Sequence, residues 1–271
     1  MPRAGPGPLL LRIISAGVMA PVALAAVWFE RPWLVLLVLL AMAVMGWEWS
    51  RLATRGGFGL LGALVIAAGL SSVGARALGG SGGIVLAIAA AGAGLVYLVA
   101  QRQRAEPVWV AAGTLWIAAG SIGFLSLGVP PWGDHWTALW LLGVVWVTDI
   151  AAYAAGRSIG GPKLAPAWSP NKTWAGFIGG VASAGVVGLV AAWLAGGRPL
   201  TLFAVSLGLG AAAQAGDLVE SLAKRHFGVK DSSGLIPGHG GLLDRVDGLL
   251  AAALAAWLLM AATGESPLVW R

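Results

Sequence analysis

The sequence predicts an all-α, polytopic integral membrane protein, and three observations lead to this fold class. Of the 271 residues, 58% are hydrophobic and only 10% are charged. The mean hydropathy is +0.84, which excludes an ordinary soluble domain. Apolar stretches of about 20 residues recur along the chain, and a helix of that length crosses about 30 Å of hydrocarbon. Helices satisfy their own backbone hydrogen bonds in lipid, so they are the expected elements.

Nine apolar stretches between charged residues are candidates for membrane spans. In chain order they are Leu9–Trp28, Trp33–Trp47, Phe58–Ala75, Gly83–Ala100, Val108–Leu127, Trp136–Ala155, Trp174–Ala195, Leu200–Val219 and Leu243–Ala262. The second stretch is short, and a re-entrant or interfacial segment is the alternative there. We expect one membrane domain of about nine helices, with N-terminal helices over residues 1–130. A C-terminal region over residues 131–271 carries the polar motifs.

The basic residues predict the orientation of the chain, because Lys and Arg are retained on the cytoplasmic side of a membrane. Of the 17 basic residues, all lie on the side of the N-terminus except Arg31, Arg76, Arg198 and Arg271. We therefore expect the N-terminus and the polar site in the cytoplasm and the C-terminus outside. The Arg- and Ala-rich, Lys-poor composition is typical of a high-GC bacterial genome, so a bacterial inner (plasma) membrane is the expected location.

Asp149 lies in an otherwise apolar span, where an ionised carboxylate is costly without a partner. Tyr153 and Gly156 follow at i+4 and i+7, so all three share one helix face. Two interpretations stay open. The carboxylate is functional, or it is structural and caps a neighbouring helix or pairs with Arg157.

The connection after this span carries several basic residues with hydroxyl and amide groups. Its last part also carries helix-start signals, because hydroxyls and amides cap free backbone N–H groups and a helix N-terminus attracts phosphate. These features predict an anion-binding segment, and an ordinary positive loop with a helix cap is the alternative. The residues concerned are Ser169, Asn171, Lys172 and Thr173.

Residues 217–247 contain the densest polar sequence in the chain. Four side chains fall at i, i+3, i+4 and i+7 of one helix face: Asp217, Glu220, Ser221 and Lys224. Asp244 and Asp247 share a face at the head of the last span in the same way. Between these two groups lies Gly238–Gly241, where missing Cβ atoms let backbone N–H groups approach a ligand.

Oxygen ligands without Cys and without paired His indicate a hard cation such as Mg²⁺. Carboxylates that hold Mg²⁺ beside Lys and Arg are typical of a phosphate-handling site. A phosphomonoester is already anionic near neutral pH, so positioning and charge neutralisation do most of the catalysis. His239 is interpreted as a hydrogen-bonded loop residue or phosphate contact, and acid–base catalysis is the alternative.

Residues 221–247 resemble the signature of the phosphatidate cytidylyltransferase (CDP-diacylglycerol synthase) family, S-x-x-K-R-x₄-K-D-x-S-x₂-[LIF]-P-x-H-G-G-x-x-D-R-x-D. The match has no gap and consists of Ser221, Lys224, Arg225, Lys230, Asp231, Ser233, Ile236, Pro237, His239, Gly240, Gly241, Asp244, Arg245 and Asp247. Upstream segments around residues 149–157, 169–173 and 216–220 are also similar to family motifs. Asn171, Ala175 and Ala223 depart from the residues usual in the family, which puts the role of the 169–176 segment in doubt.

The resemblance implies transfer of CMP from CTP to phosphatidate, giving CDP-diacylglycerol and pyrophosphate for phospholipid synthesis. It also implies Mg²⁺ dependence and a homodimer in the lipid bilayer, with no nucleic-acid partner; a second, monovalent cation is an open question. Together with the residue pattern it suggests Asp217, Asp244, Lys224 and Arg245 as catalytic residues. The expected metal ligands are Asp217, Asp244, Asp247 and Asp149. The expected substrate-binding residues are Ser169, Asn171, Lys172, Thr173, Ser221, Arg225, Lys230, Asp231, His239, Gly240 and Gly241.

Two other classes of protein remain as alternatives. A cation-coupled transporter would also place carboxylates in helices, although near the midplane and beside broken spans. A different lipid nucleotidyl- or phosphotransferase is closer, because the motif says little about acyl chains. The pattern D-x₂-D-G-x₂-A-R of the CDP-alcohol phosphotransferases is absent from the sequence.

Overall fold

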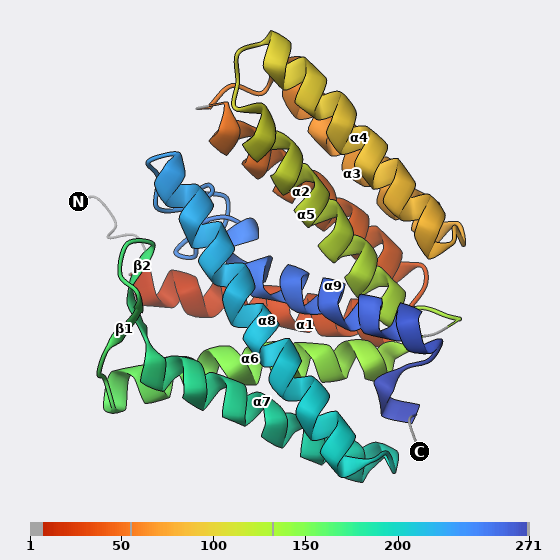
Figure 1. The fold of residues 1–271 in the computed structure, drawn as a ribbon, viewed down its shortest axis with the longest axis vertical. Coiled ribbons are helices and arrows are strands. Elements are labelled where there is room, and N and C mark those ends of the chain that lie inside the picture. The colour runs from red at the N-terminus through yellow and green to blue at the C-terminus, as the bar shows by residue number, and fades with distance from the viewer. Residues whose placement is uncertain (1–7, 55, 132, 270–271) are drawn as a thin grey trace, which may run out of the picture.

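The computed structural model describes residues 8–54, 56–131 and 133–269, and within these ranges the chain is mostly helical (Figure 1). The helices are α1 (Pro8–Trp28), α2 (Trp33–Ala53), α3 (Gly59–Ala77), α4 (Gly82–Arg102), α5 (Pro107–Leu127), α6 (His135–Ser158), α7 (Trp174–Ala195), α8 (Pro199–His226) and α9 (Leu243–Thr263). A hairpin of two antiparallel strands, β1 (Lys163–Ala165) and β2 (Ser169–Thr173), joins α6 to α7. A short 3₁₀ helix, Pro267–Val269, comes after α9. The all-α prediction is confirmed apart from this hairpin.

Eight helices, α2 to α9, are long and apolar enough to cross a membrane, counting only the described residues. The chain is therefore a polytopic membrane protein. In α1 the apolar stretch found among the described residues is Ile13–Trp28, which is shorter than a membrane span. The predicted number of nine spans therefore stays a prediction. Helix α2 has 21 residues and continues past Trp47, which favours a full span over a re-entrant segment.

The predicted orientation depends in part on the chain ends. Residues 1–7 and 270–271, which include both termini, lie outside the described ranges. An N-terminus in the cytoplasm and a C-terminus outside therefore stay predictions.

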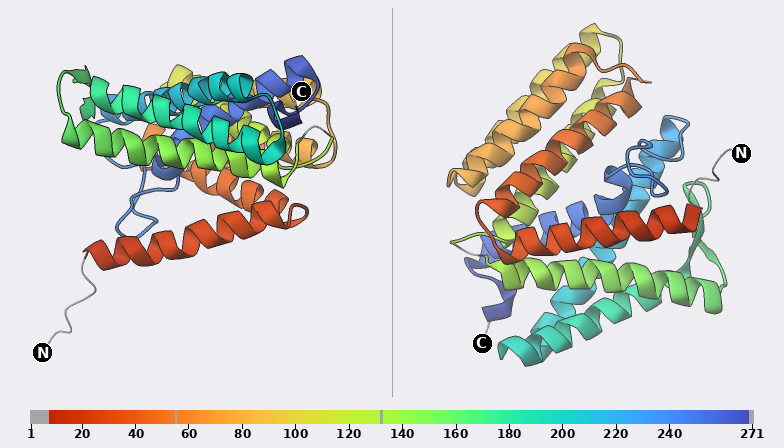
Figure 2. Two further views of the ribbon diagram at one scale, coloured as in Figure 1. Left: turned by 90° about the horizontal axis from the view of Figure 1, so that it is seen from below. Right: turned by 180° about the vertical axis from the view of Figure 1, so that it is seen from behind.

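The helices form two neighbouring groups that α9 joins (Figure 1). Helices α2 to α5 pack on one another, α6 to α8 do the same, and α9 packs on both α5 and α8. Helix α1 contacts α2 and α6 and lies along one face of the molecule (Figure 2). Large side chains such as Met42, Ile117, Leu141 and Trp257 are fully buried between the helices. The predicted boundary near residue 130 falls between α5 and α6, and it stays a prediction.

Close packing in the second group depends on glycine at the helix crossings. A Cβ added to Gly176 of α7 would lie 2.8 Å from the carbonyl oxygen of Ala152 in α6. A Cβ added to Gly216 of α8 would lie 2.7 Å from the carbonyl oxygen of Asp247 in α9. Small residues let helix backbones approach this closely. The polar ends of α6, α7, α8 and α9 are consequently brought together.

Candidate functional site

The polar motifs of the second half meet in one cavity of about 730 Å³. It lies where α6 and α8 end and where α7 and α9 begin, with β2 at its edge. Its charged lining residues are Asp149, Arg157, Lys172, Asp217, Lys224, Asp244, Arg245 and Asp247. The structure thus brings together all four carboxylates that the sequence predicts as metal ligands. We call this space the larger cavity.

Three of the carboxylates in the larger cavity come from three different helices. Asp149 belongs to α6, Asp217 to α8 and Asp247 to α9, and all three line the larger cavity. Carboxylates held close together repel one another, so a bound cation would stabilise the group. In the described residues no three acidic or histidine side chains already form a metal-binding cluster. The donor chemistry nevertheless fits Mg²⁺, because these ligands are all hard oxygens.

Basic side chains stand beside the carboxylates in this cavity. Lys172, carried by β2, places its Nζ atom 2.7 Å from Asp217 Oδ2. Arg157 donates from Nη1 to the hydroxyl of Tyr153 over 3.1 Å, one turn earlier in α6. Tyr153, rather than Asp149, is therefore the hydrogen-bonding partner of Arg157. The cavity combines anionic and cationic groups, as an ion-assisted phosphate site requires.

Asp244 is held by an extensive set of donors. Lys224 Nζ lies 2.7 Å from Asp244 Oδ1 and also pairs with the buried Glu220. The backbone N–H groups of Ser232 and Gly241 donate to Asp244 Oδ2 at 2.9 and 2.8 Å, and the Ser232 hydroxyl donates at 3.0 Å. These bonds neutralise the carboxylate and tie the start of α9 to the end of α8 and to the loop between them.

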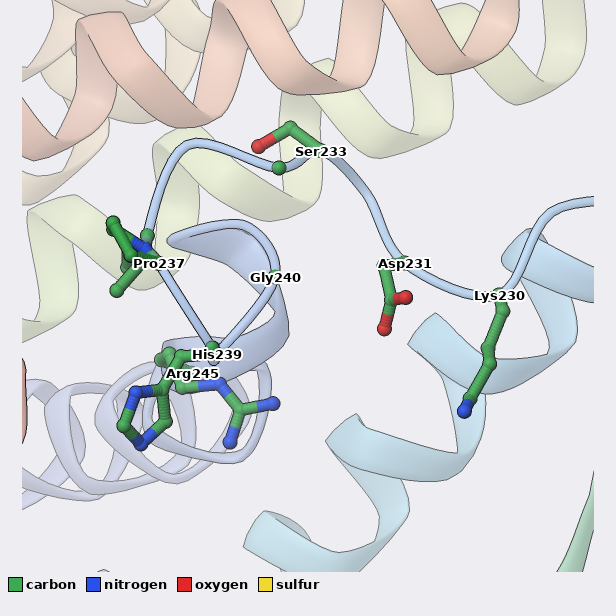
Figure 3. A pocket seen from close by; sticks show the side chains of 10 residues that line it. Lys230, Asp231, Ser233, Pro237, His239, Gly240 and Arg245 are labelled. Atoms are coloured by element: carbon green, nitrogen blue, oxygen red, sulfur yellow. The ribbon is translucent and has the colours of Figure 1, made fainter. Parts of the chain in front are cut away.

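A second cavity of about 660 Å³ lies under the loop that joins α8 to α9, and we call it the loop cavity (Figure 3). Lys230, Asp231, His239, Gly240 and Arg245 line it, and in Figure 3 the Asp231 and Arg245 side chains point into the space beside the loop. Arg245 also lines the larger cavity, so it links the two spaces. These five residues were all predicted from the sequence as parts of the site.

The loop of this second cavity is closed by a tight turn and by a contact with α1. The Ile236 N–H donates to the carbonyl oxygen of Gly240 over 2.8 Å. Gly238 and Gly240 have φ angles of +78° and +85°, which favour glycine over other residues. His239 Nδ1 lies 2.7 Å from Ser15 Oγ of α1. The single prominent histidine is thus hydrogen-bonded, as the sequence interpretation expected.

Four predicted substrate-binding residues line neither cavity in the described part of the chain. Ser221 donates to Asp217 over 3.3 Å, and Arg225 donates from Nε to the carbonyl oxygen of Trp168. Gly241 donates its N–H to Asp244, which leaves that group occupied rather than open to a ligand. Ser169 pairs with Ala165 in the hairpin. In this structure these four residues form hydrogen bonds or strand pairing with other parts of the chain.

The helix-start signal of Ser169–Thr173 is confirmed at Thr173, and the rest of the segment has a structure that the signal does not predict. The segment forms strand β2, and only its last residue caps a helix. The Thr173 hydroxyl accepts from the Gly176 N–H over 3.1 Å, at the beginning of α7. Pairing with β1 stabilises the extended backbone of the other residues, which the local helix-start signals do not reveal.

Several residues that contact the site were missed by the sequence interpretation, among them Ser232 and Glu48. Ser232 holds Asp244 through both its N–H and its hydroxyl. Glu48 reaches the same loop from α2, in the N-terminal half of the chain. The sequence offered one sign that Glu48 has a partner: it adjoins a long apolar stretch, where a carboxylate is costly without one.

A bundle of membrane-spanning helices with an acidic and basic cavity at one end defines an integral membrane protein suited to phosphate-bearing ligands. The sequence pattern of the Cytidylyltransferase family matches residues 10–263 of the chain. The chain belongs to the Cytidylyltransferase family, and it is an enzyme of the nucleotidyltransferase class.

Similar bacterial proteins carry the name phosphatidate cytidylyltransferase. The protein of Brucella suis biovar 1 (strain 1330) is 41% identical over 265 residues, which cover 95% of each chain. The protein of Staphylococcus saprophyticus is 42% identical over 166 residues, covering 58% of this chain and 61% of the relative. The protein of Haemophilus influenzae is 45% identical over 128 residues, covering 45% of this chain and 44% of the relative.

Proposed function

We propose that this protein transfers CMP from CTP to phosphatidate, giving CDP-diacylglycerol and pyrophosphate, with Mg²⁺ as cofactor. The observation that carries the proposal is the larger cavity, where Asp149, Asp217 and Asp247 lie beside Lys172 and Arg245. The names of the relatives support the choice of CTP and phosphatidate as substrates.

The two cavities suggest a division between the substrates. The larger cavity has room for a nucleotide, since ligand sites commonly measure about 300–1,000 Å³. Its Lys172 and Arg245 side chains would neutralise the triphosphate of CTP. The loop cavity, with Lys230 and His239, would hold the phosphate of phosphatidate while the acyl chains stay in the bilayer. Arg245 lines both cavities, so it would contact both substrates where they meet.

The proposed reaction needs orientation more than a strong base. An oxygen of the lipid phosphate forms a bond to the α-phosphorus of CTP, and the bond from that phosphorus to the bridging oxygen of the β-phosphate breaks. The electron pair leaves with pyrophosphate. Because the lipid phosphate is already anionic near neutral pH, cationic side chains that hold both groups in line lower the barrier.

The carboxylates would hold the divalent ion in the larger cavity. Asp217, Asp247 and Asp149, which line that cavity from three helices, are the candidates. Asp244, whose oxygens already accept from Lys224, Ser232 and Gly241, would mainly keep the start of α9 in place. A bound Mg²⁺ would supply charge neutralisation of the phosphates.

The cytoplasmic side of the membrane and a homodimer belong to the proposal as well. CTP is a cytoplasmic substrate, so the cavities should open to the cytoplasm. A reporter fused after the last residue should be active only outside the cytoplasm if nine spans are present. Cross-linking in native membranes tests for the dimer.

The deciding experiment measures pyrophosphate release by the detergent-purified protein given CTP, Mg²⁺ and phosphatidate. ATP, GTP and diacylglycerol serve as controls. Release only with CTP and phosphatidate together, and its loss after removal of Mg²⁺ with EDTA, is the expected result. No release with any nucleotide from folded protein would overturn the proposal.

A further inference from the structure

Glu48 is a buried carboxylate of α2 that lies in the N-terminal half but contacts the loop of the site. Its side chain has no solvent exposure in the structure. The loop in question, residues 227–242, joins α8 to α9 and lines the loop cavity. Glu48 is separated from this loop by more than half of the chain, so only the packing of α2 brings the two together.

Both oxygens of Glu48 accept hydrogen bonds from this loop and from the start of α9. The Ser233 hydroxyl donates to Oε1 over 2.6 Å, and the Leu242 N–H donates to the same atom over 2.9 Å. The Leu243 N–H donates to Oε2 over 2.7 Å. A Cβ added to Gly241 would lie 2.5 Å from Oε1, so the loop backbone packs directly on the carboxylate.

The carboxylate of Glu48 lies at a helix end. In the described part of the chain no ion pair involves Glu48. Two of its donors, Leu242 and Leu243, are backbone N–H groups at the N-terminus of α9. The N-terminus of a helix carries partial positive charge and favours an anion. Glu48 therefore acts as the N-terminal cap of α9, supplied from a distant helix.

The capped end of α9 carries residues of the site. Asp244, Arg245 and Asp247 occupy the first turns of α9, directly after the two capped N–H groups. Ser233, the third donor, lines the loop cavity. A shift of the loop or of this end of the helix would therefore move Arg245 relative to both cavities.

We propose that Glu48 is a positioning residue: it fixes the 227–242 loop and the first turn of α9, and so holds Arg245 and Asp244 in the arrangement that the reaction needs. This inference rests on the proposed function for its effect on turnover. The anchoring itself is a structural claim that can be tested without substrate.

The test uses a single cysteine as the only labelling site, because the chain contains no Cys. Leu235 lies in the loop, is 51% exposed and is outside the proposed machinery, so Leu235→Cys with a nitroxide label reports loop mobility by EPR. Glu48→Gln is introduced into this labelled protein. It keeps the size of the side chain but turns one acceptor oxygen into a donor, which faces Leu242 or Leu243.

Trp49→Phe is the matched control in the same helix. It removes the buried hydrogen bond from Trp49 Nε1 to the carbonyl oxygen of Val110, 3.2 Å away, which links α2 to α5. The Trp49 ring also packs on Phe227, the first residue of the loop, with ring centroids 6.3 Å apart, and the Phe side chain keeps an aromatic ring at this contact. Loss of this bond should lower thermal stability without freeing the label. If Glu48→Gln fails to fold, Glu48→Asp keeps the carboxylate but shortens the side chain by one methylene group, which withdraws its oxygens from the Ser233 hydroxyl.

We expect Glu48→Gln to give a more mobile label and a kcat lowered by about 10- to 100-fold, because small misplacements of reacting groups cost rates of this order. The KM for CTP should change little. Trp49→Phe should leave both label mobility and kcat near those of the parent. Glu48→Asp should increase label mobility to a smaller degree.

Three outcomes would overturn the inference: a label as immobile in Glu48→Gln as in the parent, a mobile label with unchanged kcat, or an equal effect of Trp49→Phe. If the unmodified protein made no CDP-diacylglycerol, the proposed function would fail instead. The EPR spectra would still decide whether Glu48 anchors the loop.

Discussion

Lys224 of α8 joins two carboxylates from different helices, since its Nζ lies 2.7 Å from Asp244 Oδ1 of α9 and also pairs with Glu220. Asp244 accepts further bonds from the intervening loop at Ser232 and Gly241. The end of α8, the loop and the start of α9 are thus one hydrogen-bonded unit. Because Lys224 pairs with both carboxylates, the unit is sensitive to the loss of this ammonium group.

Replacing Lys224 should therefore destabilise the protein strongly. Lys224→Met leaves Glu220, only 1% exposed, and Asp244 without their cation. Removing one partner of a buried pair costs about 3–5 kcal/mol. The measurement is the thermal unfolding midpoint in detergent, followed by tryptophan fluorescence. Lys230→Met removes a loop cation that forms no ion pair in the described residues, so it should lower the unfolding midpoint far less. Equal shifts of the midpoint in the two variants would contradict the stabilising role of Lys224.

Asp217 should be needed for turnover but not for folding. Its side chain is 39% exposed and bound to Lys172, so Asp217→Asn should change the free energy of unfolding by about 1 kcal/mol or less. Loss of a ligand for the divalent ion should lower pyrophosphate release by about 100-fold or more.

Asp134→Ala is the control for Asp217→Asn, because it should lower stability and leave turnover unchanged. Asp134 Oδ1 accepts from the Thr137 N–H over 2.8 Å at the far end of α6, away from both cavities. Loss of this cap should cost about 1 kcal/mol of stability and leave turnover unchanged. Normal activity in Asp217→Asn would remove Asp217 from the proposed ion site.

Lys172 should contribute to nucleotide binding through the hairpin. Lys172→Gln removes the cation next to Asp217 and should raise the KM for CTP by about tenfold, the equivalent of 1.4 kcal/mol. Lys163, on the paired strand β1, lines neither cavity and is the matched control. Steady-state kinetics at varied CTP compare the two variants. The same KM in both would mean that the charge of the hairpin, not the position of Lys172, is what matters.

Gly176 should be required for the approach of α7 to α6. Gly176→Ala would put a methyl group 2.8 Å from the carbonyl oxygen of Ala152 and should cost about 1–3 kcal/mol through overpacking. Activity should fall too, because Gly176 lines the larger cavity. At Gly208, in α8, nothing lies within 4 Å of an added Cβ, so Gly208→Ala should stabilise by about 0.5–1 kcal/mol. Thermal midpoints in one detergent test both, and a tolerated Gly176→Ala would show that the helices can separate without cost.

The sequence predicted much of the site because its polar residues stand out against an apolar background. Asp149, Asp217, Asp244 and Asp247 were all identified as site carboxylates, and all four line one cavity. Helical spacing explains the success within α8, where Glu220 pairs with Lys224 and Ser221 bonds to Asp217. Such contacts lie one turn apart and depend on local geometry alone.

The roles of individual residues could not be predicted in the same way. Gly241 was expected to offer its N–H to a ligand, yet this group donates to Asp244. The Ser169–Thr173 segment carries helix-start signals, yet most of it is a strand because β1 lies beside it. In both cases the hydrogen-bonding partner, Asp244 or strand β1, lies outside the local pattern, so that pattern cannot predict the contact.

By itself, the sequence determined the membrane class, the approximate spans, the family resemblance and the residues that bear charge. These properties depend on hydrophobic length and on a contiguous motif, and neither needs a tertiary contact. Only the tertiary structure decided that Glu48 of α2 caps α9, that Ser15 of α1 bonds to His239, and that Arg245 borders two cavities. These relationships depend on how helices distant in the chain pack together, because side-chain contacts are set by distances in space rather than along the sequence.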